Sequence, residues 1–216
     1  MTQRALAFLD AQAASSQPFL LNVDYFAPHD HGNLPSVAPR HVGHFASEPL
    51  PTPPNFNEAD VSDKPPHVRW NLLTSSNIAG ITTENRIRWE RLLAVDEGIQ
   101  NMVNKLSTMG KLANTVIIFI SDNGHFAGHH RISSGKLSYY EESIRVPFMM
   151  RGPGIPANTI RSQLVSNIDL APTILDLADT PASWATDGKS LLPLIQDAST
   201  PWRTAVFVDG FVRVDS

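Results

Sequence analysis

Apolar positions recur along the chain with two periods, and the longer period predicts helices. Between residues 84 and 110, apolar side chains are three or four residues apart, as on the buried face of an amphipathic helix, and Gly110 suits the position just past its end. The composition of 3–14 predicts a second helix. Asp169 can cap a short third helix, with Pro172 in its first turn, where a missing N–H is tolerated.

Short apolar runs rich in β-branched or aromatic residues predict the strands. The clearest is 116–120 (VIIFI), whose unbroken run indicates a strand buried on both faces. Similar runs predict strands at 19–23 and 146–150, and the tail 202–214 alternates as in a strand or hairpin. Because strand and helix signals alternate, the predicted fold class is α/β, with a largely parallel sheet flanked by helices. In such sheets ligands bind beyond the carboxyl ends of the strands.

A proline-rich stretch, 34–70, interrupts these elements. It carries eight of the 17 prolines and shows no period, which predicts a long loop. Loops of that length in compact domains are usually binding walls or lids, or else disordered. Phe45, Phe56 and Trp70 could anchor this one, which favours an ordered loop.

Composition narrows the classes of partner. The 216 residues carry a formal charge of −4 without a dense Lys/Arg block, so neither nucleic acid nor an anionic membrane surface is an expected partner. No apolar run approaches the roughly 20 residues that cross a bilayer. The absence of cysteine excludes disulfides, thiolate metal sites and a cysteine nucleophile within these residues. The first 25 residues lack the pattern of a secretory signal.

Polar residues with chemical potential follow two of the predicted strands. Asp122 and Asn123, just after 116–120, offer the hard oxygen ligands that Ca²⁺ or Mg²⁺ prefers, although with Gly124 they could equally form an ordinary Asx turn. Lys136 could meet an anion as a compact point charge or be a solvated surface lysine. His29 could bind an oxyanion or transfer a proton, or be a plain loop histidine.

Other ionisable residues carry weaker signals. Glu141 and Arg145 are four residues apart, which predicts a local ion pair, and the pair Glu141-Glu142 is typical of a solvated face. A zinc site is an alternative that neither the histidine spacing nor the absence of cysteine favours. The histidines concerned are His31, His125, His129 and His130.

Several motifs in order resemble the sulfatase family, within the alkaline-phosphatase-like superfamily. One of them, 53–69, is similar to the N-acetylglucosamine-6-sulfatase-like branch. The resemblance covers nearly the whole chain. The other motifs are FLLNVDYFAPHDH (19–31), GKLANTVIIFISDNG (110–124), GK (135–136), YEESIRVPFMMRGPG (140–154) and NIDLAPTILDLA (167–178).

The resemblance implies roles for four residues. Asp122 and Asn123 fall on two of the family's Ca²⁺ ligands, with Mg²⁺ as an alternative ion. Lys136 and His29 fall on catalytic side chains that contact the sulfate group. The implied fold is alkaline-phosphatase-like, and here incomplete.

The chain departs from the family pattern in three respects. The family's nucleophile is a formylglycine made from a Cys/Ser-x-Pro-Ser-Arg motif well before the Ala-Pro-His strand, whereas the nearest similar stretch here, 36–40 (SVAPR), follows His29. The family's first strand with paired aspartates is also missing. We therefore expect 1–200 to be the C-terminal portion of a catalytic domain and 201–216 to begin a truncated C-terminal subdomain. His125-Phe126 also stands where this branch more often has an aromatic residue followed by histidine.

The function implied is that of a sulfuric ester hydrolase acting on a sulfated carbohydrate or small sulfate ester, present as a partial catalytic domain without its formylglycine segment. By itself the chain is expected to be inactive. One alternative is a non-catalytic remnant or sulfated-glycan-binding module, and another is a phosphoester hydrolase of the same superfamily. Family members are often periplasmic, secreted or lysosomal, and the sequence indicates neither a compartment nor an oligomeric state for this chain.

Overall fold

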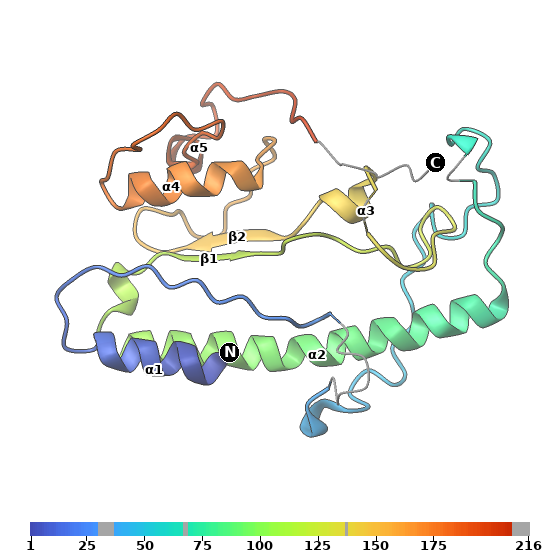
Figure 1. The fold of residues 1–216 in the computed structure, drawn as a ribbon, viewed down its shortest axis with the longest axis horizontal. Coiled ribbons are helices and arrows are strands. Elements are labelled where there is room, and N and C mark those ends of the chain that lie inside the picture. The colour runs from blue at the N-terminus through green and yellow to red at the C-terminus, as the bar shows by residue number, and fades with distance from the viewer. Residues whose placement is uncertain (30–36, 67–68, 137, 209–216) are drawn as a thin grey trace. The chain divides into compact units, whose positions relative to one another are not determined.

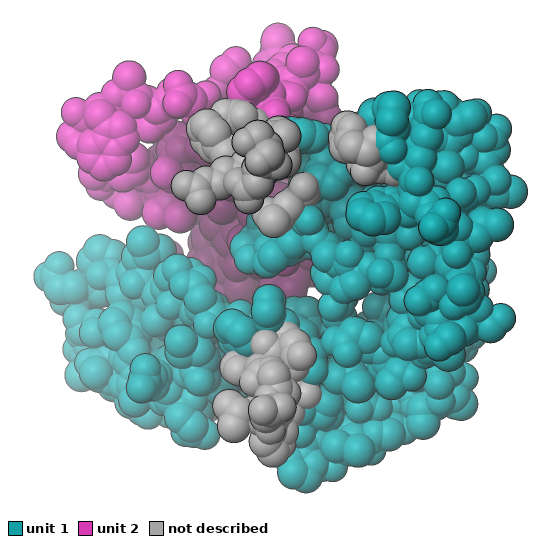
Figure 2. Space-filling view, turned by 45° about the vertical axis from the view of Figure 1, so that its right-hand side comes forward, with its two compact units in different colours: residues 1–113, 122–146 teal, residues 114–121, 147–216 magenta. Residues whose placement is uncertain are grey.

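Two helices, α1 (Thr2–Gln12) and α2 (Ser75–Thr108), lie side by side in the computed structural model of the chain (Figure 1). The structure describes residues 1–29, 37–66, 69–136 and 138–208. They divide into two units, coloured separately in Figure 2. The first unit comprises residues 1–113 and 122–146, and the second comprises residues 114–121 and 147–216.

Helix α2 is longer than the apolar period predicted, because its first nine residues lack that period. Its start is set by a capping box, in which the Thr74 hydroxyl accepts from the Asn77 backbone N–H at 3.2 Å and the Asn77 side-chain Oδ1 accepts from the Thr74 N–H at 2.9 Å. The predicted end is confirmed. Gly110 has φ +68°, and its N–H reaches the carbonyl of Ser107 at 2.9 Å, as in a Schellman motif.

Helix α1 confirms the prediction for 3–14 and packs its Ala5 and Leu9 into the core of the first unit. The hydroxyls of Thr2 and Tyr25 meet at 2.8 Å over Gly98 of α2. A Cβ at Gly98 would come within 2.4 Å of the Tyr25 hydroxyl, so a larger residue at this position would displace the two hydroxyls.

The prediction of a strand at 19–23 is wrong for the described structure. The run is apolar, but a strand also needs the hydrogen-bonding edge of a partner, and no described strand pairs with it. The predicted strands at 116–120 and 146–150 are confirmed as β1 (Ile117–Ile120) and β2 (Phe148–Arg151). Their pairing is antiparallel, so the expected parallel sheet is not seen among the described residues. β1 is half-buried, not buried on both faces.

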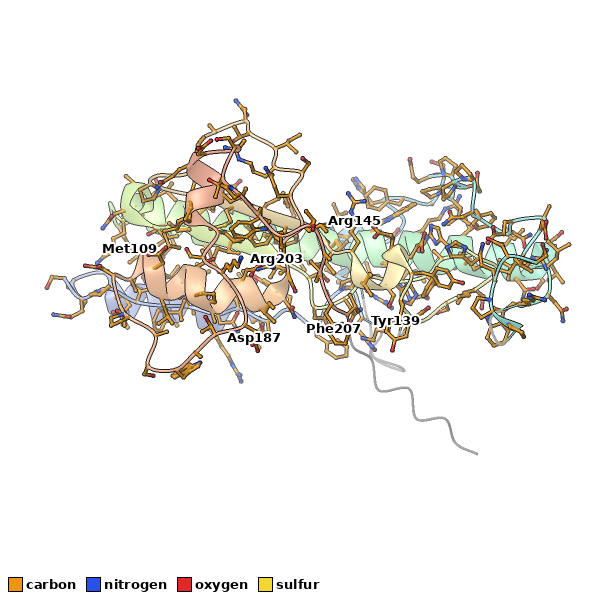
Figure 3. All side chains as sticks on the ribbon, turned by 90° about the horizontal axis from the view of Figure 1, so that it is seen from above. Met109, Tyr139, Arg145, Asp187, Arg203 and Phe207 are labelled. Carbon is orange, nitrogen blue, oxygen red and sulfur yellow. The ribbon has the colours of Figure 1, made fainter. Side chains whose placement is uncertain are left out.

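In the second unit, η4 (Asn167–Asp169) leads into α4 (Leu170–Leu177), and α5 (Leu192–Gln196) follows. Pro172 lies in the first turn of α4 as predicted. Asp169 precedes α4, but its carboxylate does not cap that helix. It accepts the N–H groups of Ser166 and Lys189, both at 2.9 Å, and forms a bidentate pair at 2.6 and 2.7 Å with Arg203, whose side chain is labelled in Figure 3.

Residues 37–66 of the proline-rich stretch are described and contain η1 (Pro39–His41). The Phe45 ring packs against Trp89 of α2, with ring centroids 5.8 Å apart. Phe56 bridges to the backbone of His129. Trp70 is more than half exposed and does not serve as the expected anchor.

The predicted strand or hairpin in the tail does not form over 202–208, and the rest of that segment lies outside the described residues. η3 (Leu112–Asn114) precedes β1. Within the described part of the chain, no helix combines the length and apolar character needed to cross a membrane.

Candidate anion and metal site

A tight turn follows β1 and presents Asp122 and Asn123. Gly124 donates its N–H to the carbonyl of Ser143 at 2.8 Å, in the short helix α3 (Glu141–Ile144). A Cβ at Gly124 would lie 2.1 Å from the carbonyl oxygen of Glu142. The turn therefore requires glycine, because this contact is with backbone that has little freedom to move.

Asn123 and Lys136 are brought together by this turn. The Asn123 amide nitrogen donates to the carbonyl of Gly124 at 2.8 Å, and its Oδ1 accepts from Lys136 Nζ at 2.9 Å. The Phe126 N–H, donating to the Gly135 carbonyl at 2.9 Å, closes the loop that separates them. Lys136 is exposed, but its ammonium is held at a defined position and is not simply solvated.

The Ala-Pro-His segment is held by α2. Arg91, which is 4% exposed, donates from Nη1 to the carbonyl of Pro28 at 3.0 Å and pairs with Glu84 at 3.4 Å. The His29 N–H donates to the Phe26 carbonyl at 3.0 Å, and the two rings lie 4.8 Å apart. A buried guanidinium thus sets the backbone from which His29 projects.

The pKa of His125 is affected by charged residues of α2, of the Ala-Pro-His segment and of the loop that carries Lys136. Burial, together with nearby positive charges, lowers the pKa of the His125 imidazole to about 4. Those charges belong to Arg88, Lys136 and His29. The imidazole is therefore neutral at neutral pH, and its Nε2 accepts from the Gly135 N–H at 3.4 Å. The positive charge of Lys136 near this loop favours an anion there.

The fit of a hard cation can be judged from the donor set. Asp122 is exposed and supplies a carboxylate, and Asn123 supplies an amide oxygen that already accepts from Lys136. Ca²⁺ takes 6–8 oxygens. Across the described ranges, three or more His, Cys, Asp or Glu side chains do not gather in a metal-holding arrangement. The donor types fit Ca²⁺ or Mg²⁺, but these two residues supply only a minority of its ligands.

A second polar cluster forms around Glu142 and His130. It shows that the expectation of a solvated face at Glu141-Glu142 is wrong for Glu142. Glu142 is not on a solvated face: its side chain is 16% exposed, accepts from Asn55 Nδ2 at 2.6 Å and lies 3.4 Å from His130 Nε2. His130 Nδ1 contacts Glu58 at 2.7 Å, and the imidazole stacks on Tyr140 at 4.3 Å. The cluster joins the proline-rich loop to the loop after β1.

Ionisation in this cluster follows from its contacts. Burial alone would raise the pKa of the Glu142 carboxyl, but its hydrogen bonds to backbone and Asn55, with the charge of His130, lower that pKa overall. Burial lowers the pKa of His129, against the attraction of Glu142. The predicted local pair Glu141–Arg145 is confirmed at 3.4 Å and is fully at the surface.

Two residues named from the sequence fall outside the described ranges, namely His31 and Ser36. Pro39 and Arg40 of the 36–40 stretch lie in η1, and Arg40 is paired with Glu97. Sequence reasoning missed Glu84, Arg88 and Arg91. Their spacing of four and seven residues on one predicted helix places them on one face, and that spacing was the available signal.

Comparison with known proteins decides the family. The sequence model of the sulfatase family matches residues 1–180. The chain belongs to the sulfatase family. The family assignment made from the motifs is thereby confirmed.

Relatives of this sulfatase-family chain include N-acetylglucosamine-6-sulfatases. The one from Bos taurus is 36% identical over 213 residues, covering 95% of this chain and 36% of its own length. A putative extracellular sulfatase Sulf-1 homolog from Caenorhabditis elegans is 34% identical over 225 residues, covering 97% of this chain and 31% of its own. The chain thus spans about a third of the length of these relatives.

Solved structures confirm the sulfatase, alkaline-phosphatase-like fold. One, in complex with its substrate D-glucosamine-2-N,6-O-disulfate, matches with a TM-score of 0.68 and 25% identity over 94% of this chain and 53% of that one. A phosphonate monoester hydrolase from Silicibacter pomeroyi matches with a TM-score of 0.73 and 24% identity over 94% of this chain and 42% of that one.

Proposed function

We propose that this chain is part of a sulfuric ester hydrolase that acts on sulfated sugars. The observation that carries the proposal is the hydrogen bond between Lys136 and Asn123, which holds an ammonium beside oxygen donors suited to a metal ion. The relatives named as N-acetylglucosamine-6-sulfatases, and the neighbour bound to a disulfated glucosamine, support a sulfated sugar as the substrate class.

Lys136 and His29 are proposed to bind the sulfate group. An ammonium has three N–H donors, and Asn123 takes one of them, so Lys136 can also donate to a sulfate oxygen. Its charge would stabilise negative charge that develops on the ester oxygens as the bond breaks. His29 would donate a hydrogen bond to the same anion or transfer a proton to the leaving oxygen.

Asp122 and Asn123 are proposed to hold Ca²⁺, or alternatively Mg²⁺, as two of its oxygen ligands. When bound, the ion would supply further positive charge to the sulfate oxygens. Asn123 would then bridge the ion and Lys136, because a carbonyl oxygen has two lone pairs. The remaining oxygens, and the formylglycine nucleophile of the family, are not assigned to any residue of this chain.

The largely parallel sheet expected from the alternation of elements is likewise a proposal, since it needs strands beside those described. An exported setting is proposed for the whole protein, because one relative is named an extracellular sulfatase. We expect the 216-residue chain to bind a sulfate ester without turning it over.

Titration of the 216-residue chain with N-acetylglucosamine 6-sulfate, followed by calorimetry, tests the proposal. Lys136→Met should weaken binding by about tenfold or more, because a charge-assisted hydrogen bond is worth about 1.5–3 kcal/mol. Lys189→Met removes the same charge from an exposed position in the second unit and serves as the matched control.

The result that overturns the proposal is equal affinity in the two variants. N-acetylglucosamine 6-phosphate separates the ester classes, because it presents the same sugar with a different anion. Tighter binding of this phosphate than of the sulfate would favour a phosphoester hydrolase.

A further inference from the structure

The first unit contains a cavity of about 310 Å³ between α2 and the loop that follows Asn123. This volume lies near the lower end of the range of about 300–1,000 Å³ for small-molecule sites. It suits one compact ligand group better than an extended chain.

One wall of the cavity is a single face of α2. Ser76, Gly80, Glu84 and Arg88 line it at four-residue steps, so they stand above one another along the helix. Gly80 lies in the middle of this face. A Cβ added there would meet nothing within 4 Å, so the missing side chain leaves open space. Glycine in a helix interior is destabilising, and here its effect is to leave the cavity unfilled.

The remaining lining residues are partly polar and partly apolar. His125, Ser133 and Ser134 line the loop side, while Ile81 and Phe126, 8% and 1% exposed, form the apolar part. Glu84 and Arg88 of the helical wall pair at 3.5 Å. Hydroxyl and amide groups around apolar surface fit a ring with hydroxyls at its edge and C–H groups on its face.

The cavity shares its loop with the candidate anion site. Ser134 lies two residues before Lys136, and His125 lies two residues after Asn123. The hydrogen bond from the Phe126 N–H to the Gly135 carbonyl joins the two ends of this loop. A ligand group in the cavity therefore lies against the same loop that carries Lys136.

We propose that this cavity binds an uncharged sugar ring of the sulfated glycan and that Gly80 provides the room for it. The proposal rests on the proposed function, because Lys136 is taken to hold the sulfate of the same ligand. It assigns a role in substrate selection to the face of α2 that carries Ser76, Gly80 and Glu84.

The test fills the cavity without removing a functional group. Gly80→Leu should weaken binding of N-acetylglucosamine 6-sulfate by about tenfold or more, a loss of roughly 1.4 kcal/mol, and leave binding of inorganic sulfate unchanged. Ala79→Leu adds similar bulk at an exposed neighbour that does not line the cavity and should have no effect. Circular dichroism should show that both variants melt no lower than the parent, since leucine favours helix.

If Gly80→Leu lowers the melting temperature, Gly80→Ala replaces it in the test, because the added Cβ meets nothing within 4 Å and should not disturb the fold. It should weaken sugar binding by a smaller factor than leucine. Equal affinity of the parent, Gly80→Ala and Gly80→Leu for N-acetylglucosamine 6-sulfate would overturn the inference.

Failure of the inference and failure of the proposed function have different signatures. If only the inference fails, Lys136→Met still weakens binding of N-acetylglucosamine 6-sulfate, whereas Gly80→Leu leaves that binding unchanged. If only the anion site fails, inorganic sulfate does not bind and Lys136→Met has no effect, while binding of unsulfated N-acetylglucosamine still falls in Gly80→Leu. That second pattern would support the cavity as a sugar site.

Discussion

Lys136 Nζ donates to Asn123 Oδ1 over 2.9 Å, so one amide oxygen connects the candidate metal ligand with the candidate anion-binding cation. The two residues are 13 positions apart, so local sequence alone does not bring them into contact. The charge of the group at 123 should therefore influence cation and anion binding in opposite directions.

Asn123→Asp should strengthen Ca²⁺ binding and weaken sulfate ester binding. A carboxylate adds ligand charge for Ca²⁺ and neutralises the Lys136 ammonium. Calorimetry with each ligand measures both effects, and the parent chain should bind Ca²⁺ more weakly than micromolar because two residues supply few of its oxygens. Asn101→Asp adds the same charge at an exposed position of α2 and should change neither affinity. Weaker Ca²⁺ binding by Asn123→Asp would contradict this role.

Gly124→Ala should destabilise the first unit. Its Cβ would stand 2.1 Å from the Glu142 carbonyl oxygen, so the turn and α3 must separate, at a cost of about 1–3 kcal/mol. Thermal unfolding followed by circular dichroism measures the loss. Gly80→Ala makes the same substitution in open space and should raise the melting temperature. Similar melting temperatures for the two variants would show that the turn adapts freely.

His130→Phe should loosen the proline-rich loop. Phenylalanine can keep the stacking on Tyr140 but removes the contacts with Glu58 and Glu142, leaving partly buried carboxylates with fewer partners, a loss of about 1–3 kcal/mol. Limited proteolysis should then cut within 55–66 sooner than in the parent. His44→Phe, at an exposed position, is the control. Unchanged cleavage in His130→Phe would mean that other contacts hold the loop.

The second unit should lose stability in acid through Asp169. Burial alone would raise the pKa of this carboxyl, but hydrogen bonds from Arg203, Lys189 and Ser166 lower the pKa overall. A lowered folded-state pKa means that the stabilisation is fully present above the unfolded value of about 3.9 and disappears as the pH falls through the folded value.

Melting temperatures between about pH 2 and pH 6 measure this dependence. Asp169→Asn should be less stable than the parent near neutral pH, with the difference narrowing in acid. Asp187→Asn, at the exposed residue labelled in Figure 3, should follow the parent throughout. A constant difference between Asp169→Asn and the parent across this range would contradict the role of its ionisation.

Local sequence signals determined several elements. The apolar period identified the body of α2, and Gly110 marked its end because a left-handed residue there favours glycine. The apolar runs at 116–120 and 146–150 identified β1 and β2. The ordered motifs identified the family. Each of these depends on residues close together in the chain or on their order.

Tertiary structure decided the features that depend on contacts between residues far apart in the sequence. The run at 19–23 has strand composition, but a strand also requires a neighbouring edge, and the sequence of the run does not specify one. The sequence predicted a solvated Glu142, whereas in the folded chain Asn55 and His130 contact its carboxylate. The contact of Lys136 with Asn123 and the open space beside Gly80 likewise arise where distant segments meet. By itself, then, the sequence determined the family and the local elements, whereas folding decided which charges and cavities face one another, because distances between remote residues are set only by packing.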